Sequence, residues 1–477
     1  MDTKKLRQKI LDLAIRGKLV PQDPNDEPAS VLLERIRAEK EHLIKEGKIK
    51  RTKKSNASDT SHYENVPFEL PEGWCWGNLI NLCHIFGRIG FRGYTKEDLV
   101  THDGAITLSP SNIIEGKMNY NSCTYISWKK YDESPEIQIQ ENDILLVKTG
   151  SSYGKCALVE KLPKQATINP QFVVLKHISC NPEYLTYVLQ SKYAQNNYEK
   201  FVLGTAIPTF TQVALGNMQI PIPPLTEQNR IVKEIKRLLG IIESLESNKK
   251  HLQDIVTLSK SKILEIALSG KLISQNTYDE PAIEVLKRIN PSYQPCDNRH
   301  YENVPFKVPE TWVWARGKEL FLSMSNCKPS GDYFKYIDID SIDNKNCVIK
   351  SPKILPVISA PSRATRYTRI GDVLFSMVRP YLKNIAMVTE DNCIASSGFY
   401  VCSPNESLIS KYCYYLMISP YVVNGLTQFM KGDNSPSINH VHINEWLYPI
   451  PPLNEQNRIV QKVDKLFRYL DSIAIEL

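Results

Sequence analysis

Apolar residues recur at alternating steps of four and three residues along two stretches of the chain, each of which follows a pair of prolines. This is the a/d spacing of heptads, and it predicts two long helices that pack along their length. A single amphipathic helix on a globular core is the alternative interpretation. Because one chain carries two such rows, we expect the helices to pack against each other. The packing positions are Ile231, Ile235, Leu238, Ile242, Leu245, Leu252 and Val256 in the first row and Ile459, Val463, Leu466, Leu470, Ile473 and Leu477 in the second.

The first of these helices has clear signals at its start. Pro223 and Pro224 prevent an earlier start, and Thr226, followed by Glu227 and Gln228, suits the N-terminal cap and the first turn. The apolar pattern continues through KILEIALSGKL, so we expect the helical segment to end near residue 290.

Between the helical stretches the pattern changes to short apolar runs separated by Gly, Pro, Asn and Ser, which predicts strands and turns. The runs lie at 144–147, 172–175, 373–376 and 399–402. One longer stretch in each half, at 182–201 and at 406–426, has the character of a helix, the second broken at Pro420. We therefore predict mixed α/β domains beside the long helices.

The chain contains three segments twice, in the same order. HYENVPFELPEGWCW (62–76) returns as HYENVPFKVPETWVW (300–314) with 11 of 15 positions identical, and PIPPLTEQNRIV (221–232) returns as PIPPLNEQNRIV (449–460) with 11 of 12. The segment that begins KILDLAIRGKL (9–36) returns at 262–289 with 15 of 28 positions identical. Three such matches in one order indicate an internal duplication.

The second heptad row stops at Leu477, while the segment that would continue it stands at the start of the chain, at residues 9–19. The repeat is therefore circular. We expect the N-terminal helix to dock where the C-terminal helix ends and to complete the second copy there. The expected fold class is α+β, with two mixed α/β domains separated by two long helices in a circular pseudo-two-fold repeat.

The segments 77–220 and 315–448 differ much more than the repeats that flank them, so we expect two copies of one fold with different surfaces. A stretch at 45–61 that is first basic and then rich in Ser and Asn has no apolar period, and we expect it to be a mobile linker. The predicted organisation is an N-terminal helical segment (1–44), the basic linker (45–61), a first variable domain (62–225), a central helical region (226–298), a second variable domain (299–453) and a C-terminal helix (454–477).

The composition is that of an ordinary globular protein: 477 residues, 42% hydrophobic, 23% charged, with a net charge of +7 that permits nucleic-acid binding. The eleven cysteines form no CxxC pair and the nine histidines no HxxxH or HExxH spacing, so we expect reduced thiols and no metal site. No apolar run reaches the ~18 residues of a membrane span. The start of the chain has no apolar signal core, and we expect a cytoplasmic protein.

The stretch KTGSSYGKCALV (148–159) looks like a phosphate-binding loop but fails as one. A Walker A motif needs four residues between its glycine and Gly-Lys, followed by Ser or Thr, and a helix after the loop. Here three residues intervene, Cys156 follows Lys155, and the residues CALV predict a strand. We find no methyltransferase tetrapeptide, no GxSxG elbow and no paired acids with a credible context. The sequence therefore predicts a binding protein and disfavours an ATPase.

Two different domains held by rigid helices suit the recognition of a two-part target, as in many DNA readers. Polar side chains of the variable segments are then candidates for contact with DNA bases and phosphates. For each of them an ordinary exposed polar group is the alternative. The candidates are Arg88, Arg92, Lys96, Lys148, Ser151, Ser152, Tyr153, Lys155 and Thr205 in the first copy and Arg363, Arg366, Arg379, Tyr381, Lys383, Asn384, Lys431 and Asn434 in the second.

The whole chain resembles the specificity subunit of type I restriction–modification systems. The resemblance rests on PIPPLTEQNRIV and PIPPLNEQNRIV, on NDILLVKTGSSYGKCALV (142–159) with its partner GDVLFSMVRPYLKNIAMV (371–388), on GTAIPTF (204–210), and on KILDLAIRGKLVPQ with KILEIALSGKLISQ. The circular repeat is a further point of resemblance.

The resemblance implies that the variable segments are target-recognition domains, each of which reads half of a split DNA sequence. It also implies that the long helices form an antiparallel spacer that binds two methyltransferase subunits, which carry S-adenosylmethionine, and that a translocating ATPase–nuclease subunit with its ATP and Mg²⁺ joins for cleavage. The chain itself would hold no cofactor and catalyse nothing. The alternative is a solitary adaptor of the same fold that binds DNA or protein without a restriction system.

Overall fold

The computed structural model describes residues 2–46, 67–88, 90, 93–204, 207–294 and 304–476. Its contacts divide the chain into two compact units, Met1–Ser247 and Asn248–Leu477. The boundary lies within α8 (Leu225–Leu268), a helix of 44 residues that contributes its first part to one unit and its last part to the other. Nearly all of the linker predicted at 45–61 lies outside the described residues.

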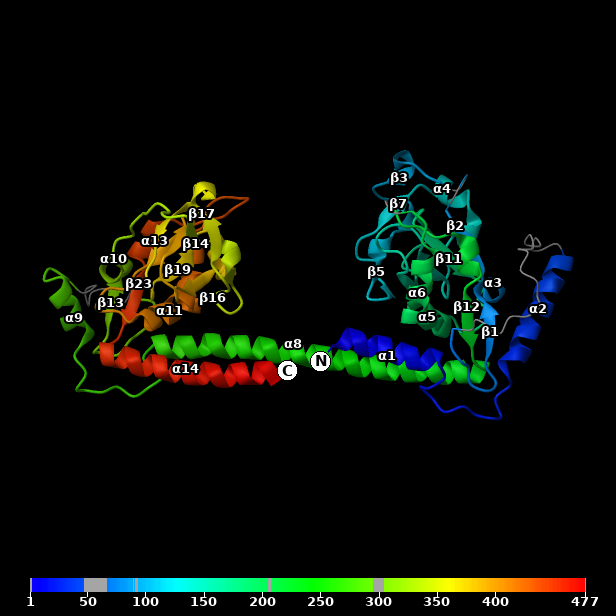
Figure 1. Ribbon diagram of the computed structural model, residues 1–477, viewed down its shortest axis with the longest axis horizontal. Coiled ribbons are helices and arrows are strands. Elements are labelled where there is room, and N and C mark those ends of the chain that lie inside the picture. Colours follow the sequence, from blue (N-terminus) through cyan, green and yellow to red (C-terminus); the bar gives the residue numbers. More distant parts are fainter. Residues whose placement is uncertain are drawn as a thin grey trace. The chain divides into compact units, whose positions relative to one another are not determined.

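The first unit combines two N-terminal helices, a domain of short strands and helices, and the start of α8 (Figure 1). Its helices are α1 (Thr3–Ile15), α2 (Ala29–Lys45), α3 (Leu79–Leu82), α4 (Trp128–Asp132), α5 (Pro182–Gln190), α6 (Lys192–Phe201) and α7 (Gln212–Gly216). Its strands are β1 (Cys75–Asn78), β2 (His84–Gly87), β3 (Leu99–Val100), β4 (Ala105–Leu108), β5 (Ile113–Ile114), β6 (Lys117–Met118), β7 (Thr124–Ile126), β8 (Ile144–Val147), β9 (Cys156–Leu158), β10 (Ala166–Ile168), β11 (Phe172–Lys176) and β12 (Gln219–Ile222).

The second unit repeats this arrangement with the end of α8 in place of α1. Its helices are α9 (Ala282–Ile289), α10 (Gly317–Leu320), α11 (Ser410–Ile418), α12 (Pro420–Thr427), α13 (His440–Glu445) and α14 (Leu453–Glu476). Its strands are β13 (Val313–Arg316), β14 (Tyr333–Ile337), β15 (Ile342–Asp343), β16 (Val348–Ile349), β17 (Lys353–Pro356), β18 (Ala364–Tyr367), β19 (Val373–Ser376), β20 (Ile385–Met387), β21 (Cys393–Ser396), β22 (Phe399–Cys402) and β23 (Leu447–Ile450).

The sheets of the two units share a central arrangement and differ in their outer strands. In the first unit, an antiparallel sheet in the order β2-β11-β8-β9 lies beside a mixed sheet in the order β10-β4-β7-β3, whose β10–β4 pair is parallel. In the second, the orders are β20-β19-β22 and β17-β14-β21-β18, with β14 and β21 parallel. A two-stranded ladder, β1–β12 or β13–β23, joins each domain to the helix that follows. The prediction of two mixed α/β domains is confirmed.

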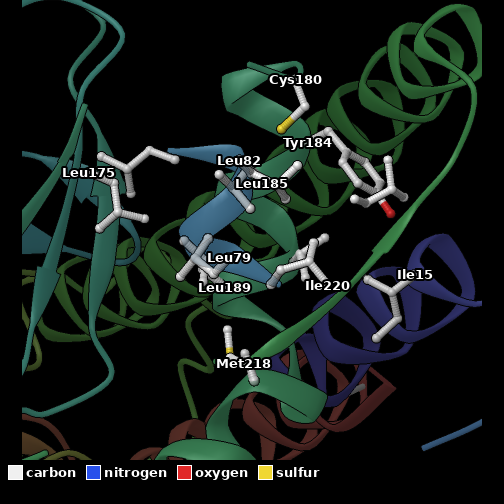
Figure 2. Packing of buried hydrophobic residues seen from close by; sticks show 14 of the residues in the cluster. Ile15, Leu79, Leu82, Leu175, Cys180, Tyr184, Leu185, Leu189, Met218 and Ile220 are labelled. Atoms are coloured by element: carbon white, nitrogen blue, oxygen red, sulfur yellow. The ribbon is translucent and has the colours of Figure 1, made fainter. Parts of the chain in front are cut away.

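The central strands are buried on both faces, which explains their unbroken apolar runs. In β8, Ile144 and Leu146 point into a cluster shared with α1, α3, α5 and α8, whereas Leu145 and Val147 point into a second cluster shared with the mixed sheet. Figure 2 shows part of the first cluster, with Tyr184 of α5 among its labelled side chains. The four strands predicted from short apolar runs are confirmed as β8, β11, β19 and β22.

Two of the predicted helices are broken. The stretch 182–201 forms α5 and α6, because Ser191 adopts an extended conformation (φ −68°, ψ 158°) and its hydroxyl accepts a hydrogen bond from the backbone nitrogen of Ala194. A serine in the middle of the stretch thus caps a second helix. The predicted break at Pro420 is confirmed, and there Ser419 caps α12 through Val422 in the same way.

The central helix ends earlier than predicted. Instead of continuing to residue 290, α8 stops at Leu268, and Gly270 (φ +71°) closes it by donating from its backbone nitrogen to the carbonyl of Ala267. Glycine relieves the strain of this left-handed position and is the usual residue there. Gly17 (φ +64°) ends α1 in the same manner. At the other end, Thr226 lies inside the first turn of α8, and its hydroxyl donates to Asp26 instead of capping the helix.

The heptad rows pack within their units only at some of the predicted positions. The buried positions are Ile231, Ile235, Ile242, Val256, Ile459 and Val463, and Leu238, Leu466 and Leu470 are half-buried. Leu245, Leu252 and Ile473 are 45%, 37% and 47% exposed, so the prediction that they pack is wrong for these units. Leu477 lies outside the described residues. In the second unit α8 and α14 pack together, with Lys260 bonded to Asp471 at 2.5 Å.

The N-terminal helix completes the first unit, not the second as expected. Ile10 of α1 lies in the same buried cluster as Ile231 of α8, and Arg7 pairs with Glu246 at 2.8 Å. The corresponding place in the second unit is taken by the end of α8, where Leu264 lies in one cluster with Ile459. The repeat at 9–36 shows which segments are alike, but the contacts made after α1 decide which copy it joins.

A polar clasp in the first unit connects the loop after α1 to the first turn of α8. Glu227, only 1% exposed, accepts hydrogen bonds from Gln22 Nε2 (3.1 Å) and from Trp74 Nε1 (3.0 Å). Burial raises the pKa of Glu227, and these two hydrogen bonds oppose the shift. One turn later, Arg230 holds both carboxylate oxygens of Asp26, at 3.2 and 2.5 Å. Such two-point pairing fixes orientation as well as distance.

The second unit repeats the glutamine–glutamate bond and the arginine–aspartate pair of this clasp. Gln275 Nε2 donates to Glu455 at 2.7 Å, and Arg458 holds both oxygens of Asp279 at 3.2 and 2.6 Å. Burial likewise raises the pKa of Glu455. The EQNRIV segments therefore contact the repeated Asp-Glu-Pro segments, which stand at 26–28 and 279–281, in both units.

The glutamine of each EQNRIV segment joins the helix to the variable domain. Gln228 accepts a hydrogen bond from the backbone nitrogen of Asn181 (2.8 Å) and donates to the carbonyl of Pro223 (2.9 Å). Gln456 accepts from the nitrogen of Ile409 at the same 2.8 Å. Because both glutamines are fully buried, these bonds satisfy groups that would otherwise be costly.

The replacement Asp26→Asn tests the clasp. We expect it to lower the free energy of unfolding of the first unit by about 1 kcal/mol at pH 7, because the partly exposed pair is screened by solvent. The hydrogen bond from Arg230 lowers the pKa of Asp26, so its contribution is present above the pKa of an unfolded aspartate, about 3.9, and is lost as the pH falls below it. Urea unfolding followed by tryptophan fluorescence at pH 7 and pH 3 measures both values.

The matched control is Asp23→Asn in the same loop, since within the described residues the Asp23 carboxylate accepts hydrogen bonds from Asn25 and none from an arginine. It should leave the free energy of unfolding nearly unchanged at both pH values. A deficit in the Asp26 variant that is the same at pH 3 as at pH 7 would contradict the assigned role of the ion pair.

Candidate nucleic-acid interface

A loop of the first unit, 148–155, and the described parts of a second segment, 203–204 and 207–209, are held side by side where β8 ends and β11 begins. This end of the β2-β11-β8-β9 sheet is called the loop edge. The backbone nitrogen of Gly150 donates to the carbonyl of Pro208 at 2.9 Å, and the hydroxyls of Thr149 and Thr209 lie 2.8 Å apart. Leu203 and Thr209 close the second loop through a backbone bridge. Both segments contain residues that the sequence predicts as candidates for DNA contact, and the fold brings the two segments together.

The second unit builds the same pair of loops from 377–384 and 431–437. The nitrogen of Arg379 donates to the carbonyl of Pro436 at 2.8 Å, as Gly150 does to Pro208, and its Nη2 donates to the carbonyl of Asn434 at 2.7 Å. Lys431 and Ser437 form the closing bridge. The backbone frame is therefore conserved between the two copies within the chain.

Two left-handed residues shape the first loop in each unit. Gly150 and Gly154 have φ values of +97° and +82°, and Arg379 and Lys383, at the matching positions, have φ values of +48° and +55°. This conformation costs a residue other than glycine about 1–2 kcal/mol. The second unit thus keeps the turn but carries two basic residues in a strained backbone, and such strain is typical of binding sites.

The side chains of the first loop differ in exposure. Ser151 and Lys155 are exposed, and Ser152 and Tyr153 are half-buried. Lys148 is also half-buried, and burial lowers its pKa. No partner for its ammonium group is present among the described residues.

Arg88 is not available to DNA, so this prediction is corrected. It is 1% exposed, and its guanidinium donates from Nε to the carbonyl of Ile168 (2.6 Å) and from Nη2 to the hydroxyl of Thr167 (2.8 Å). It therefore ties the end of β2 to β10 inside the domain. Lys96 is exposed on a short 3-10 helix, Lys96–Asp98, but no recorded contact places it beside the paired loops. Arg92 and Thr205 lie outside the described residues.

The second unit exposes most of its candidates. Asn384 is the exception: it is 6% exposed, and its carbonyl accepts from the nitrogen of Ser376 (3.1 Å), so it belongs to the sheet rather than the surface and this prediction is corrected. Lys383 is half-buried. The exposed candidates are Arg363, Arg379, Tyr381, Lys431 and Asn434.

Arg363, directly before β18, lies next to the start of the first loop, whereas Arg366 lies farther along β18. The carbonyl of Arg363 accepts from the nitrogen of Ser397, and the next residue, Gly398, accepts from the nitrogen of Met377 at the start of the loop (3.0 Å). Arg366 Nη1 donates to Asn326 at 2.9 Å. Its Nε is shielded from water and has no acceptor among the described residues, and no contact places Arg366 beside the paired loops.

Several residues of this edge were missed in the sequence. Gln171 accepts from the nitrogen of Lys148 (2.8 Å), and Asn169 Nδ2 holds its side-chain oxygen at 3.0 Å. Gln212 follows the second loop at the start of α7, and Asn326 bonds to Arg366 of β18 in the second unit. Only Asn169 and Gln171 had a usable signal, because they form the turn directly before a predicted strand.

The remaining chemistry of the edge is that of hydrogen-bond donors. The loop 148–155 leads into β9, not into a helix, so the prediction that KTGSSYGKCALV lacks the Walker A context is confirmed. No group of three or more His, Cys, Asp or Glu residues in the described part is arranged to hold a metal ion. None of the described helices is long and apolar enough to cross a membrane.

The replacement Lys383→Gly tests the strained turn. Removing the left-handed strain outweighs the entropy cost of glycine, so we expect the free energy of unfolding of the second unit to rise by roughly 0.5–1 kcal/mol, while affinity for duplex DNA falls. The control Lys345→Gly removes an exposed lysine from another turn, where φ is not positive, and should lower stability. Equal destabilisation by both changes in chemical denaturation would refute the assignment of strain.

Comparisons with known proteins identify the family of the chain. A family model described as "Type I restriction modification DNA specificity domain" matches residues 119–254 and 315–476. The EcoAI specificity subunit of Escherichia coli is 27% identical, with 98% of this chain and 89% of that protein covered. The EcoEI specificity subunit of Escherichia coli is 26% identical, with 99% and 90% covered. A solved structure from a study of type I R-M complex assembly matches the fold with a TM-score of 0.58, at 20% identity and with 86% and 94% of the two chains covered. Because the family model covers more than half of its residues, the chain belongs to the type I restriction–modification DNA specificity family and is a target-recognition subunit that is not itself catalytic.

Proposed function

We propose that the two units read the two halves of a bipartite duplex DNA target, each through its own pair of loops. One observation carries this proposal: the same hydrogen-bonded loop frame presents different side chains in the two units. Gly150 and Gly154 of the first loop correspond to Arg379 and Lys383, and Lys148 corresponds to Met377. Two domains that read different DNA sequences require the same loop backbone with different donor side chains.

The donors suit base edges and phosphates. Arg and Lys donate to the O6 and N7 of guanine in the major groove, and amide side chains pair with adenine. The same cations also bind phosphates, which fixes register without reading sequence. Exposed Lys155, Arg363 and Arg379 serve either purpose from their positions at the loop edge.

We further propose that the long helices dock two methyltransferase subunits. Large apolar side chains that remain in solvent mark protein interfaces, and α8 exposes Ile241 (46%) and Leu245 (45%) in the first unit and Leu252 (37%) and Leu258 (70%) in the second. These partners would bring S-adenosylmethionine for adenine methylation. A restriction subunit would bring ATP and Mg²⁺ for translocation and cleavage. A complex that acts on chromosomal DNA works in the cytoplasm, so that location is part of the proposal.

Exchanging residues 77–220 for the matching segment of a relative with another target tests the division of labour. Because the clasp residues of the helices remain, we expect the hybrid to fold and to change its preference in one half of the target only. Selection of binding sites from a pool of random duplexes, carried out with the full chain and its methyltransferase subunits, reads both halves at once. A change in both halves or in neither would refute the assignment.

The same preparation separates this proposal from a solitary adaptor. Wild-type and hybrid chains should both co-purify with the methyltransferase subunits, since the exchange leaves α8 and α14 intact. A chain that selects DNA but never retains a methyltransferase would favour the adaptor.

A further inference from the structure

Two strands of the first unit, β2 and β8, end at the loop edge, and β11 begins there. Val147, the last residue of β8, pairs with Phe172, the first of β11, and Gly87, the last of β2, pairs with Val173. Lys148 and Gln171 therefore stand opposite each other just beyond the sheet, joined by the bond from the lysine nitrogen to the glutamine carbonyl.

Three donor side chains project from one face of this edge. Lys148 follows Leu146 by two positions, and Gln171 precedes Val173 by two, so both point to the face of the sheet on which Leu146 and Val173 lie. Gln212 lies over the same face at the third strand: its Nε2 is 2.4 Å from where a Cβ on Gly87 would stand. Adjacent strands are about 4.8 Å apart, so the three donors span about 10 Å.

These donors lack acceptors. Within the described residues the ammonium group of half-buried Lys148 meets no carboxylate or carbonyl, and Gln212 Nε2 has no hydrogen-bond partner. The oxygen of Gln171 is occupied by Asn169 Nδ2 at 3.0 Å, which leaves its NH₂ group as the free end. Polar groups that are withdrawn from water without partners are costly, and an acceptor-rich ligand removes that cost.

The second unit keeps the backbone at the start of the loop and lacks the donor side chains of Lys148 and Gln171. Met377 donates from its nitrogen to the carbonyl of Gly398 (3.0 Å) and accepts from the nitrogen of Ile438 (2.9 Å), as Lys148 does with Gln171 and Phe210. Met377 and Gly398 thus replace Lys148 and Gln171 in an unchanged frame. At these two positions the backbone bonds are the same in both units and the side chains differ.

We propose that Lys148 is a specificity-determining residue that reads a guanine in the half-site of the first unit, with Gln171 and Gln212 as neighbouring donors. The inference rests on the proposed function and names the base class for one of its two readers. Guanine offers two acceptors, O6 and N7, on one edge, and an ammonium group can only donate. The second unit, with methionine at this position, has no such preference there.

The test is Lys148→Met, which installs the residue that the second unit already carries in the same frame. Binding sites are selected from random duplexes by the full chain with its methyltransferase subunits. We expect the variant to lose preference for guanine at one position of one half-site by about 5- to 150-fold, with the other half and the salt dependence of binding unchanged. Lys148→Arg should retain the preference, because arginine also donates to both acceptors.

The matched control is Lys161→Met. Lys161 is exposed and follows the opposite end of β9 from the loop edge, so its loss should alter neither half-site. Weakening of all sequences by Lys148→Met, with a salt slope lower by about one, would make Lys148 a phosphate contact and overturn the inference. An unchanged sequence preference would overturn it as well. If the wild-type chain selects no two-part sequence, the proposed function itself fails.

Discussion

The arrangement of each unit depends on the clasp between the loop after the first helix and the helix that leaves the variable domain. Asp26 with Arg230, and Asp279 with Arg458, fix where the two helices cross the base of the domain. Gln228 and Gln456 then attach that base to the domain through backbone groups. These residues act together, because a buried amide or carboxylate that loses its partner is destabilising. This explains why the repeats are nearly identical here and diverge elsewhere.

A rigid base allows the recognition edge to vary. The two loops of each unit are joined to each other by backbone hydrogen bonds, so their path does not depend on which side chains they carry. The second unit even holds Arg379 and Lys383 in a conformation that suits glycine. Backbone bonding that tolerates this strain also tolerates the exchange of lysine for methionine at the loop start. The loop positions can therefore diverge between the two units without a change in the path of the backbone.

Much of the architecture could be predicted from the sequence, because internal repeats and unbroken apolar runs are local signals. The strands at 144–147 and 373–376 and the break at Pro420 were of this kind. The break at Ser191 and the end of α8 before Gly270 were missed, since a capping serine and a closing glycine also occur inside longer helices.

The candidate site was less accessible to prediction. Arg88 is a charged residue of a type that is usually exposed, and only the fold shows its bonds to β10. Asn384 looked like a loop donor but lies in a ladder. The N-terminal helix was assigned to the wrong copy because similarity identifies equivalent segments and not their contacts. Gln212 was missed for the same reason, as its place over β2 depends on a long-range packing contact.

The most direct measurement is a map of methylated adenines in genomic DNA from cells that produce the chain together with its methyltransferase subunits. Two different readers on one chain predict methylation within a single asymmetric sequence of two short parts, separated by a gap of fixed length and unspecified bases. Methylation of one contiguous sequence, or of adenines in no common sequence, would contradict the account.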